Sequence, residues 1–325
     1  MKCLIRNVEK MYKIKWIRSR VNTLKNRAKS WVIIAKSVTL SGIFEALRSE
    51  YRMKPKNIIP TELLNNRIQN KIGLEIGGPT FIFMKSHIFP IYRLANEMDN
   101  VNYSSNTIWS DSNVTKQRIF NRQIINEASN LTEIDNENYD FVVSSNVVEH
   151  LSNPLLAMLE MKRVTRPNGL IITIVPHRDV IFDHKRNITS LEFLVESFES
   201  TMVEGDISHL DVEKIFADYD LDLDPPAGNL DSFKERTFNN MSNRALHQTV
   251  FNTELLLKMF NWSGIRILNI RTSLNIGHIL VIGEKSDCSL NEIQKFNSRF
   301  LASNADWRHN TIFRSEKIRK NVQVL

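Results

Sequence analysis

The chain has 325 residues, of which 42% are hydrophobic and 24% charged, a composition typical of a globular protein with a large core. It contains only Cys3 and Cys288 as cysteines, and no apolar run approaches the roughly 20 residues that span a bilayer. These features exclude a disulfide-rich secreted protein and an integral membrane protein. The basic start lacks the apolar region of a signal peptide, so a cytoplasmic protein is expected.

Positive charge is concentrated at the beginning of the chain. The formal net charge is +7, but residues 1–58 alone carry 15 Lys and Arg against three acidic residues. Apolar residues recur there at helical spacing, as at Ile5, Val8, Tyr12, Val21, Leu24, Ala28 and Trp31. We therefore expect a basic helical extension over residues 1–58. Its first 30 residues either lie on the anionic inner face of a membrane or pack against the domain or a partner protein.

Residues 59–285 alternate between strand and helix patterns. This alternation predicts an α/β fold with a doubly wound, mostly parallel sheet. Strands are expected at residues 71–77, 101–104, 122–128, 139–145, 170–175, 266–270 and 279–283. Helices are expected at residues 61–69, 81–95, 153–165 and 253–259, the third with Asn153 as its N-cap and Pro154 as its first residue. Residues 286–325 form a polar C-terminal tail.

The first predicted strand ends in a turn that is suited to ligand binding. Its residues are Glu75, Ile76, Gly77, Gly78 and Pro79. In open α/β sheets, ligands bind beyond the carboxyl ends of the strands, and glycines let the backbone approach them closely. The turn lacks the glycine spacing of a dinucleotide site, and the Glu75 carboxylate favours an ammonium or sulfonium ligand over a phosphate. The alternative is a simple structural turn.

A second segment narrows the fold class further. Residues 136–169 read NENYDFVVSSNVVEHLSNPLLAMLEMKRVTRPNG, an acidic turn, a buried strand, an Asn-x-x-Glu-His sequence and a helix that ends before a Pro-x-Gly turn. Together with the glycine turn, this segment closely resembles class I S-adenosylmethionine-dependent methyltransferases. The resemblance covers residues 71–176 well and 250–285 more loosely. It implies a Rossmann-like sheet of seven strands and S-adenosylmethionine as the cofactor.

The resemblance also implies which residues bind the cofactor. By position these are Glu75, Gly77, Gly78, Asn102, Glu127, Ala128 and Asn146. The glycines and Asn146 border the methionine part, Asn102 the ribose, and Glu127 with Ala128 the adenine. Asn102 replaces the acid that relatives usually carry, and Pro79 stands where a glycine is frequent. These departures leave open a binding or scaffold protein with a decayed cofactor site.

Residues 177–250 form an insertion between the fifth strand and the last helix. This segment contains four of the eight histidines and 15 of the 36 acidic residues, and loops of such length usually have a function. Its Phe182-Asp183-His184-x-Arg186-x-x-Thr189 sequence resembles a bacterial methyltransferase subgroup associated with glycan and surface-polysaccharide synthesis. We therefore expect the insertion to be a substrate lid.

The candidate catalytic residues lie in this insertion and after the fourth strand. Asp183 and His184 are the predicted acid/base pair for a sugar hydroxyl, and His150 is a second candidate base or else a structural residue that closes its turn. In the alternative interpretation of the insertion, Asp183 and Arg186 form a salt bridge that pins it in place.

Three further residues are expected to bind the acceptor. Arg178 and Arg186 are predicted to hold a carboxylate or phosphate, and His247 to complete the pocket. The spacing of Asp206, His209 and His247 matches no tight ligand motif, so no metal site is predicted.

The sequence thus predicts methyl transfer from S-adenosylmethionine to a hydroxyl of a saccharide or glycan precursor. Methylation of another small metabolite is the alternative enzyme function. The acidic insertion argues against a nucleic-acid substrate.

Overall fold

The computed structural model describes residues 66–83, 89–108, 119–274 and 278–286. The predicted basic extension at residues 1–58 lies outside these ranges, as does the predicted tail after residue 286. Of the predicted helix at 61–69, only residues 66 and 67 are described as helical. None of the described helices is long and apolar enough to cross a membrane.

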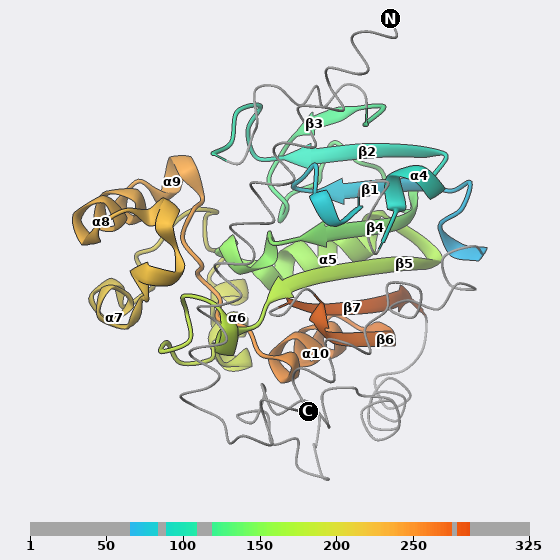
Figure 1. The fold of residues 1–325 in the computed structure, drawn as a ribbon. Helices are drawn as coiled ribbons and strands as arrows, with labels where there is room; N and C mark the ends of the chain where they lie inside the picture. The colour runs from blue at the N-terminus through green and yellow to red at the C-terminus, as the bar shows by residue number, and fades with distance from the viewer. Residues whose placement is uncertain (1–65, 84–88, 109–118, 275–277, 287–325) are drawn as a thin grey trace, which may run out of the picture.

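A seven-stranded sheet organises the described residues (Figure 1), with strand order β3-β2-β1-β4-β5-β7-β6. The strands are β1 (Ile72–Ile76), β2 (Glu97–Asn102), β3 (Gln123–Ile125), β4 (Tyr139–Ser145), β5 (Thr165–Pro176), β6 (Ile265–Leu274) and β7 (His278–Lys285). Strands β1 to β5 pair in parallel, and β7 runs antiparallel to both β5 and β6. The predicted mostly parallel α/β sheet is confirmed.

Strand β5 begins earlier than the sequence indicated. The expected turn at residues 167–169 belongs to the strand, which starts at Thr165, and its pairing with β4 shifts register between Tyr139 and Phe141. Asn168 in this irregular part has φ +61°, a left-handed conformation that Asn tolerates. The Pro-x-Gly sequence therefore produces an irregularity within a strand instead of ending one.

Side chains of the central strands alternate between the two faces of the sheet. In β4, Tyr139 and Val142 belong to the core on one face, and Phe141 and Val143 to the core on the other. Strands buried on both faces are hydrophobic nearly throughout, as the 139–145 sequence is. This explains why β4 could be located exactly.

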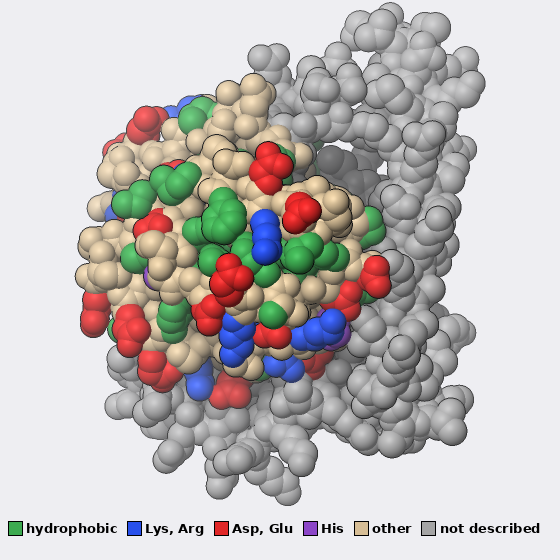
Figure 2. Space-filling view, turned by 90° about the vertical axis from the view of Figure 1, so that its left-hand side faces the viewer, with side chains coloured by type: hydrophobic (Ala, Val, Ile, Leu, Met, Phe, Trp, Pro, Cys, Tyr) green, Lys and Arg blue, Asp and Glu red, His purple; other side chains and the backbone are tan. Residues whose placement is uncertain are grey.

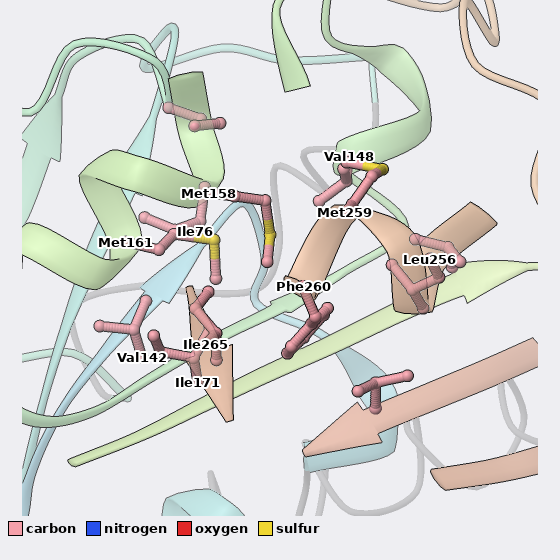
Figure 3. Close-up of a cluster of buried hydrophobic side chains, with 14 of the residues drawn as sticks. Ile76, Val142, Val148, Met158, Met161, Ile171, Leu256, Met259, Phe260 and Ile265 are labelled. Atoms are coloured by element: carbon pink, nitrogen blue, oxygen red, sulfur yellow. The ribbon is translucent and has the colours of Figure 1, made fainter. Parts of the chain in front are cut away.

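Three helices cover the first face: α5 (Pro154–Val164), α6 (Leu191–Glu199) and α10 (Thr253–Trp262). Met158 and Met161 of α5 meet Phe260 of α10 over the sheet (Figure 3). Helix α5 starts as predicted, because the Asn153 side chain accepts a hydrogen bond from the Leu156 amide at 3.1 Å and Pro154 follows it.

Residues on either side of β1, within 66–70, 81–83 and 89–95, cover the second face, and their buried side chains include Ile68, Phe83 and Phe89. The prediction of one helix over residues 81–95 is wrong. A short 3-10 turn, η2 (Phe81–Phe83), and a single helical turn, α4 (Ile91–Leu94), are described there instead. Pro90 explains the interruption, since it has no N–H to donate and restricts the residue before it.

The insertion folds into a helical layer with a small core of its own. It contains the helices α7 (Val212–Asp218), α8 (Leu230–Phe238) and α9 (Asn240–Asn243). Its buried apolar residues are Ile215, Phe216, Tyr219, Ala227, Phe233 and Leu246. These helices lie beyond the carboxyl ends of the parallel strands (Figure 1). Figure 2 faces this side and shows acidic side chains interspersed with basic and apolar ones.

Candidate active site

A cavity of about 700 Å³ lies where the parallel strands end, between the sheet and the insertion. Its floor includes Gly77, Asn102 and Asn146, which lie at or just after the ends of β1, β2 and β4. Strand order reverses between β1 and β4, and such switch points are where open α/β sheets bind ligands. The volume is within the range of about 300–1,000 Å³ typical of small-molecule sites.

The glycine turn after β1 has a backbone that only glycine fits well. Gly77 has φ +81° and Gly78 φ +76°. A Cβ on Gly77 would lie 2.5 Å from Cγ2 of Val147, and one on Gly78 would lie 2.3 Å from the Glu75 carboxyl group. Both glycines line the cavity, so the turn presents bare main chain to a ligand.

The buried side-chain amides of Asn100 and Asn102 hold this turn in shape. Asn100 Nδ2 donates to the Glu75 carbonyl oxygen at 3.2 Å. Asn102 Nδ2 donates to the carbonyl oxygens of Gly77 and Gly78, both at 3.3 Å, and to Asn100 Oδ1 at 2.8 Å. A carboxylate at position 102 has no hydrogen to donate to those carbonyls. The amide that departs from the usual acid therefore supports the turn, and its carbonyl oxygen is the group that can accept from a ribose hydroxyl.

Glu75 lies beneath the turn and not in the cavity wall. It is fully buried, with Oε2 accepting from the Tyr92 hydroxyl at 2.6 Å and Oε1 from the Thr80 amide at 3.2 Å. Burial raises the pKa of Glu75 to about 7, although these hydrogen bonds oppose the shift. The expected direct contact with the cofactor is replaced by support of the glycine turn.

The remaining predicted cofactor residues border the cavity. Ala128 is buried. Asn146 adopts φ +53°, and its main-chain N–H donates to the Ile174 carbonyl oxygen at 2.9 Å. Glu127 forms a salt bridge of 2.7 Å with Arg244 Nη2 of the insertion. This salt bridge places a lid residue directly at the predicted adenine position.

Glu149, His150 and His247 gather in the cavity wall. His150 and His247 meet edge to face with ring centroids 4.6 Å apart. Burial and the neighbouring His247 hold the pKa of His150 well below its ordinary value, so its imidazole is neutral at physiological pH. Burial raises the pKa of Glu149 to about 7, against the opposing effect of His247. We call these three residues the Glu-His-His cluster.

Asp183 supports the cluster from outside the cavity. Its carboxylate accepts from Arg186 Nη1 at 2.7 Å and lies 2.6 Å from His247 Nδ1. Burial acts to raise the pKa of Asp183, but Arg186 and His247 outweigh it and hold the pKa below its ordinary range. The predicted pairing of Asp183 with His184 is wrong, because Asp183 pairs with Arg186, the alternative noted above, and with His247.

The other predicted lid residues also lie away from the cavity wall. His184 Nε2 lies 2.8 Å from Asp220 Oδ2, and Arg178 binds Asp179 Oδ1 through Nε and Nη2, both at 3.1 Å. Arg186 donates hydrogen bonds to Asp183 and, at 2.8 Å, to the His247 carbonyl oxygen. The expected anion-binding role of Arg178 and Arg186 is thus not supported, and the arginines that line the cavity are Arg236 and Arg244.

Part of the chain is similar to a known protein family. Residues 87–173 match the family model described as a methyltransferase domain. No curated protein matches the chain in sequence.

Solved structures with similar folds include two enzymes. A SAM-dependent methyltransferase from Aquifex aeolicus is 11% identical with a TM-score of 0.37, over 72% of this chain and 99% of that one. A 1,6-didemethyltoxoflavin-N1-methyltransferase from Burkholderia thailandensis is 9% identical with a TM-score of 0.38, over 74% of this chain and 88% of that one. Similarities at this level do not indicate an acceptor.

The sequence did not reveal which residues of the insertion line the cavity. Phe182 lines the cavity, with its ring centroid 4.6 Å from that of His247 and 4.8 Å from that of Tyr219. Arg236 binds Asp224 at 2.8 Å, also in the cavity wall. No short motif contains these residues, and only the fold of the insertion brings them together.

The raised pKa of Glu75 leads to a prediction about stability. Since the folded state keeps the proton up to about pH 7 while the ordinary pKa is 4.5, ionisation opposes folding. The contribution of Glu75 is therefore fully present below pH 4.5 and is lost as pH rises toward 7, by up to about 1.4 kcal/mol per pH unit. Glu75→Gln should flatten this fall in the free energy of unfolding.

Urea denaturation at several pH values measures the effect. Glu254→Gln is the matched control, because Glu254 lies on the exposed side of α10 with 44% of its side chain accessible. A wild-type slope in Glu75→Gln, or a flattened slope in Glu254→Gln, would contradict the assignment.

Proposed function

We propose that this chain transfers a methyl group from S-adenosylmethionine to a hydroxyl of a small saccharide or glycan precursor. The observation that supports this function best is the composition of the cavity. A glycine turn of bare main chain forms one wall of the cavity, and the Glu-His-His cluster forms another. The donor binds at the first wall and the acceptor at the second.

The residues at the first wall fit S-adenosylmethionine. The bare main chain of Gly77 and Gly78 in the cavity wall lets the methionine part approach closely, and the Asn102 carbonyl oxygen can accept from a ribose hydroxyl. The Glu127 carboxylate can accept from the adenine amino group once Arg244 shares or releases it. S-adenosylmethionine is the methyl donor, and its sulfonium supplies a carbon already activated for displacement.

At the second wall, the protein has to align the acceptor and promote loss of its proton. The methyl group passes to the acceptor oxygen as the hydroxyl proton leaves, so a group that favours the deprotonated oxygen is needed there. His247 is held for this by Asp183 on one side and by the Arg186 contact to its carbonyl on the other. Fixed side chains maintain the in-line geometry on which methyl transfer depends.

A saccharide acceptor is favoured by the mixed character of this wall. Phe182 contributes apolar surface to this wall, and the Asp224–Arg236 pair offers hydrogen-bonding groups for the hydroxyls of a sugar. The resemblance of the Phe182–Thr189 segment to glycan-associated methyltransferases points to the same acceptor. An O-methylated sugar identified by mass spectrometry would support the proposal, whereas products methylated only on nitrogen or carbon would contradict it.

Donor binding should depend on the glycine turn. Gly77→Ala should weaken binding of S-adenosylhomocysteine in calorimetry by roughly tenfold or more, because a left-handed backbone costs a non-glycine residue about 1–2 kcal/mol and forces the turn to move. Gly228→Ala is the matched control, since Gly228 has φ +74° but lies outside the cavity wall. Equal affinity in the two variants would show that the donor binds elsewhere.

Turnover should depend on His247 and on Asp183, which contacts the His247 ring. His247→Gln and Asp183→Asn should lower kcat by about 10²–10⁴-fold with donor affinity near wild type, as expected for loss of a group that assists proton removal. His184→Gln should have little effect, because His184 faces Asp220 outside the cavity wall. If His184→Gln alone stopped turnover in a folded, donor-binding protein, the acid/base group would belong to the 183–184 pair.

A further inference from the structure

The Glu-His-His cluster has the composition and spacing of a metal site. One ligand atom from each of Glu149, His150 and His247 can be chosen so that all three lie within 4.8 Å of one another. Both histidines are 8% exposed and Glu149 is fully buried. The cluster faces a cavity with room for further ligands, as catalytic metal sites do.

Both imidazoles are oriented by a second partner. His150 Nδ1 lies 3.2 Å from the Leu246 carbonyl oxygen, which can only accept, so Nδ1 carries the hydrogen. His247 Nδ1 lies 2.6 Å from Asp183 Oδ2, a carboxylate that Arg186 keeps ionised. In the neutral form of either ring, Nε2 is then the nitrogen with a lone pair. Metal-binding histidines almost always have such a carbonyl or carboxylate behind them.

Glu149 supplies an independent indication of a missing ligand. Both of its carboxylate oxygens are buried and have no hydrogen-bond partner among the described residues. A buried carboxylate without hydrogen bonds is costly unless it is neutralised, paired or bound to a metal. A cation between the three side chains satisfies all of them.

We propose that Glu149, His150 and His247 bind a divalent transition-metal ion. Two imidazoles and one carboxylate suit zinc or a similar ion better than magnesium or calcium, which prefer oxygen ligands. This inference rests on the proposed function and specifies how its acceptor side operates. With the ion bound, the acceptor hydroxyl would become a further metal ligand, and its proton would leave to solvent. The oxygen–methyl bond then forms as the sulfur–methyl bond breaks.

The test uses the full chain, stripped of metal by a chelator and then titrated with Co²⁺ as a spectroscopic probe. We expect one equivalent to bind, with visible absorption bands of a four- or five-coordinate site, and Zn²⁺ to displace it. Glu149→Gln and His150→Gln should abolish stoichiometric binding. Asp183→Asn should weaken it about 10–100-fold, as loss of an outer partner does.

His209→Gln is the matched control, because His209 belongs to the same insertion but stacks on Phe193 outside the cluster. It should bind Co²⁺ as the wild type does. Zn²⁺ should also raise the Tm of the wild type and of His209→Gln but not that of Glu149→Gln, which separates loss of the site from loss of the fold.

The proposal is overturned if the folded wild type binds no stoichiometric Co²⁺, or if Glu149→Gln binds it unchanged. It is equally overturned if methyl transfer proceeds at full rate in the chelator-treated protein. Calorimetry with S-adenosylhomocysteine distinguishes the two proposals. Metal binding without donor binding would support the metal site and refute the methyltransferase function. Donor binding without metal binding would refute the metal site and leave the methyltransferase function in place.

Discussion

The arrangement of the active site depends on one buried side chain, Arg186. Its Nη1 donates at 2.7 Å to Asp183, near the start of the insertion. The same Nη1 donates at 2.8 Å to the carbonyl oxygen of His247, which lies near the end of the insertion and 61 positions after Arg186. Main-chain hydrogen bonds from Arg178 to Phe251 and from Thr189 to Val250 join the same two ends. Removing one member of such a buried ionic group leaves the other charge uncompensated, which costs several kcal/mol. The insertion is therefore closed at its base, and His247 is fixed over the ends of the strands.

This closure explains why the two walls of the cavity are built differently. The donor wall consists of main chain whose shape follows from the end of β1, with Asn102 of the neighbouring strand holding the turn carbonyls. The acceptor wall consists of side chains, because its residues come from the β4 end and from the insertion. Glu149 also binds the insertion through its own carbonyl, which accepts from the amides of Gln248 and Thr249. Under the proposed function, the sheet thus supplies the donor site, and the insertion contributes to the acceptor wall.

The sequence allowed prediction of what depends on local pattern. Strands such as 139–145 are continuous apolar runs, and the Asn153–Pro154 start of α5 follows from capping chemistry. The Gly77–Gly78 turn was recognisable because its glycines are needed for backbone conformation alone. The helix expected over residues 81–95 does not form as one element, because Pro90 interrupts it before α4.

The acceptor side was less predictable because its contacts join distant residues. Asp183 and His184 are neighbours in the chain, yet their side chains bind His247 and Asp220, 64 and 36 positions away. The importance of Glu149 appears only in the fold, where its carboxylate is enclosed beside two histidines, one of them almost 100 positions further along the chain. Likewise, Arg178 and Arg186 looked available for an anion in the sequence, but the acids that bind them are themselves part of the insertion.

Under the proposed function, donor and acceptor meet between the glycine turn and the Glu-His-His cluster. A crystal structure with S-adenosylhomocysteine tests it most directly: the sulfur should lie between Gly77 and that cluster, with the adenine near Glu127. A sulfur atom at the Glu127 end, or a ligand outside the cavity, would contradict it.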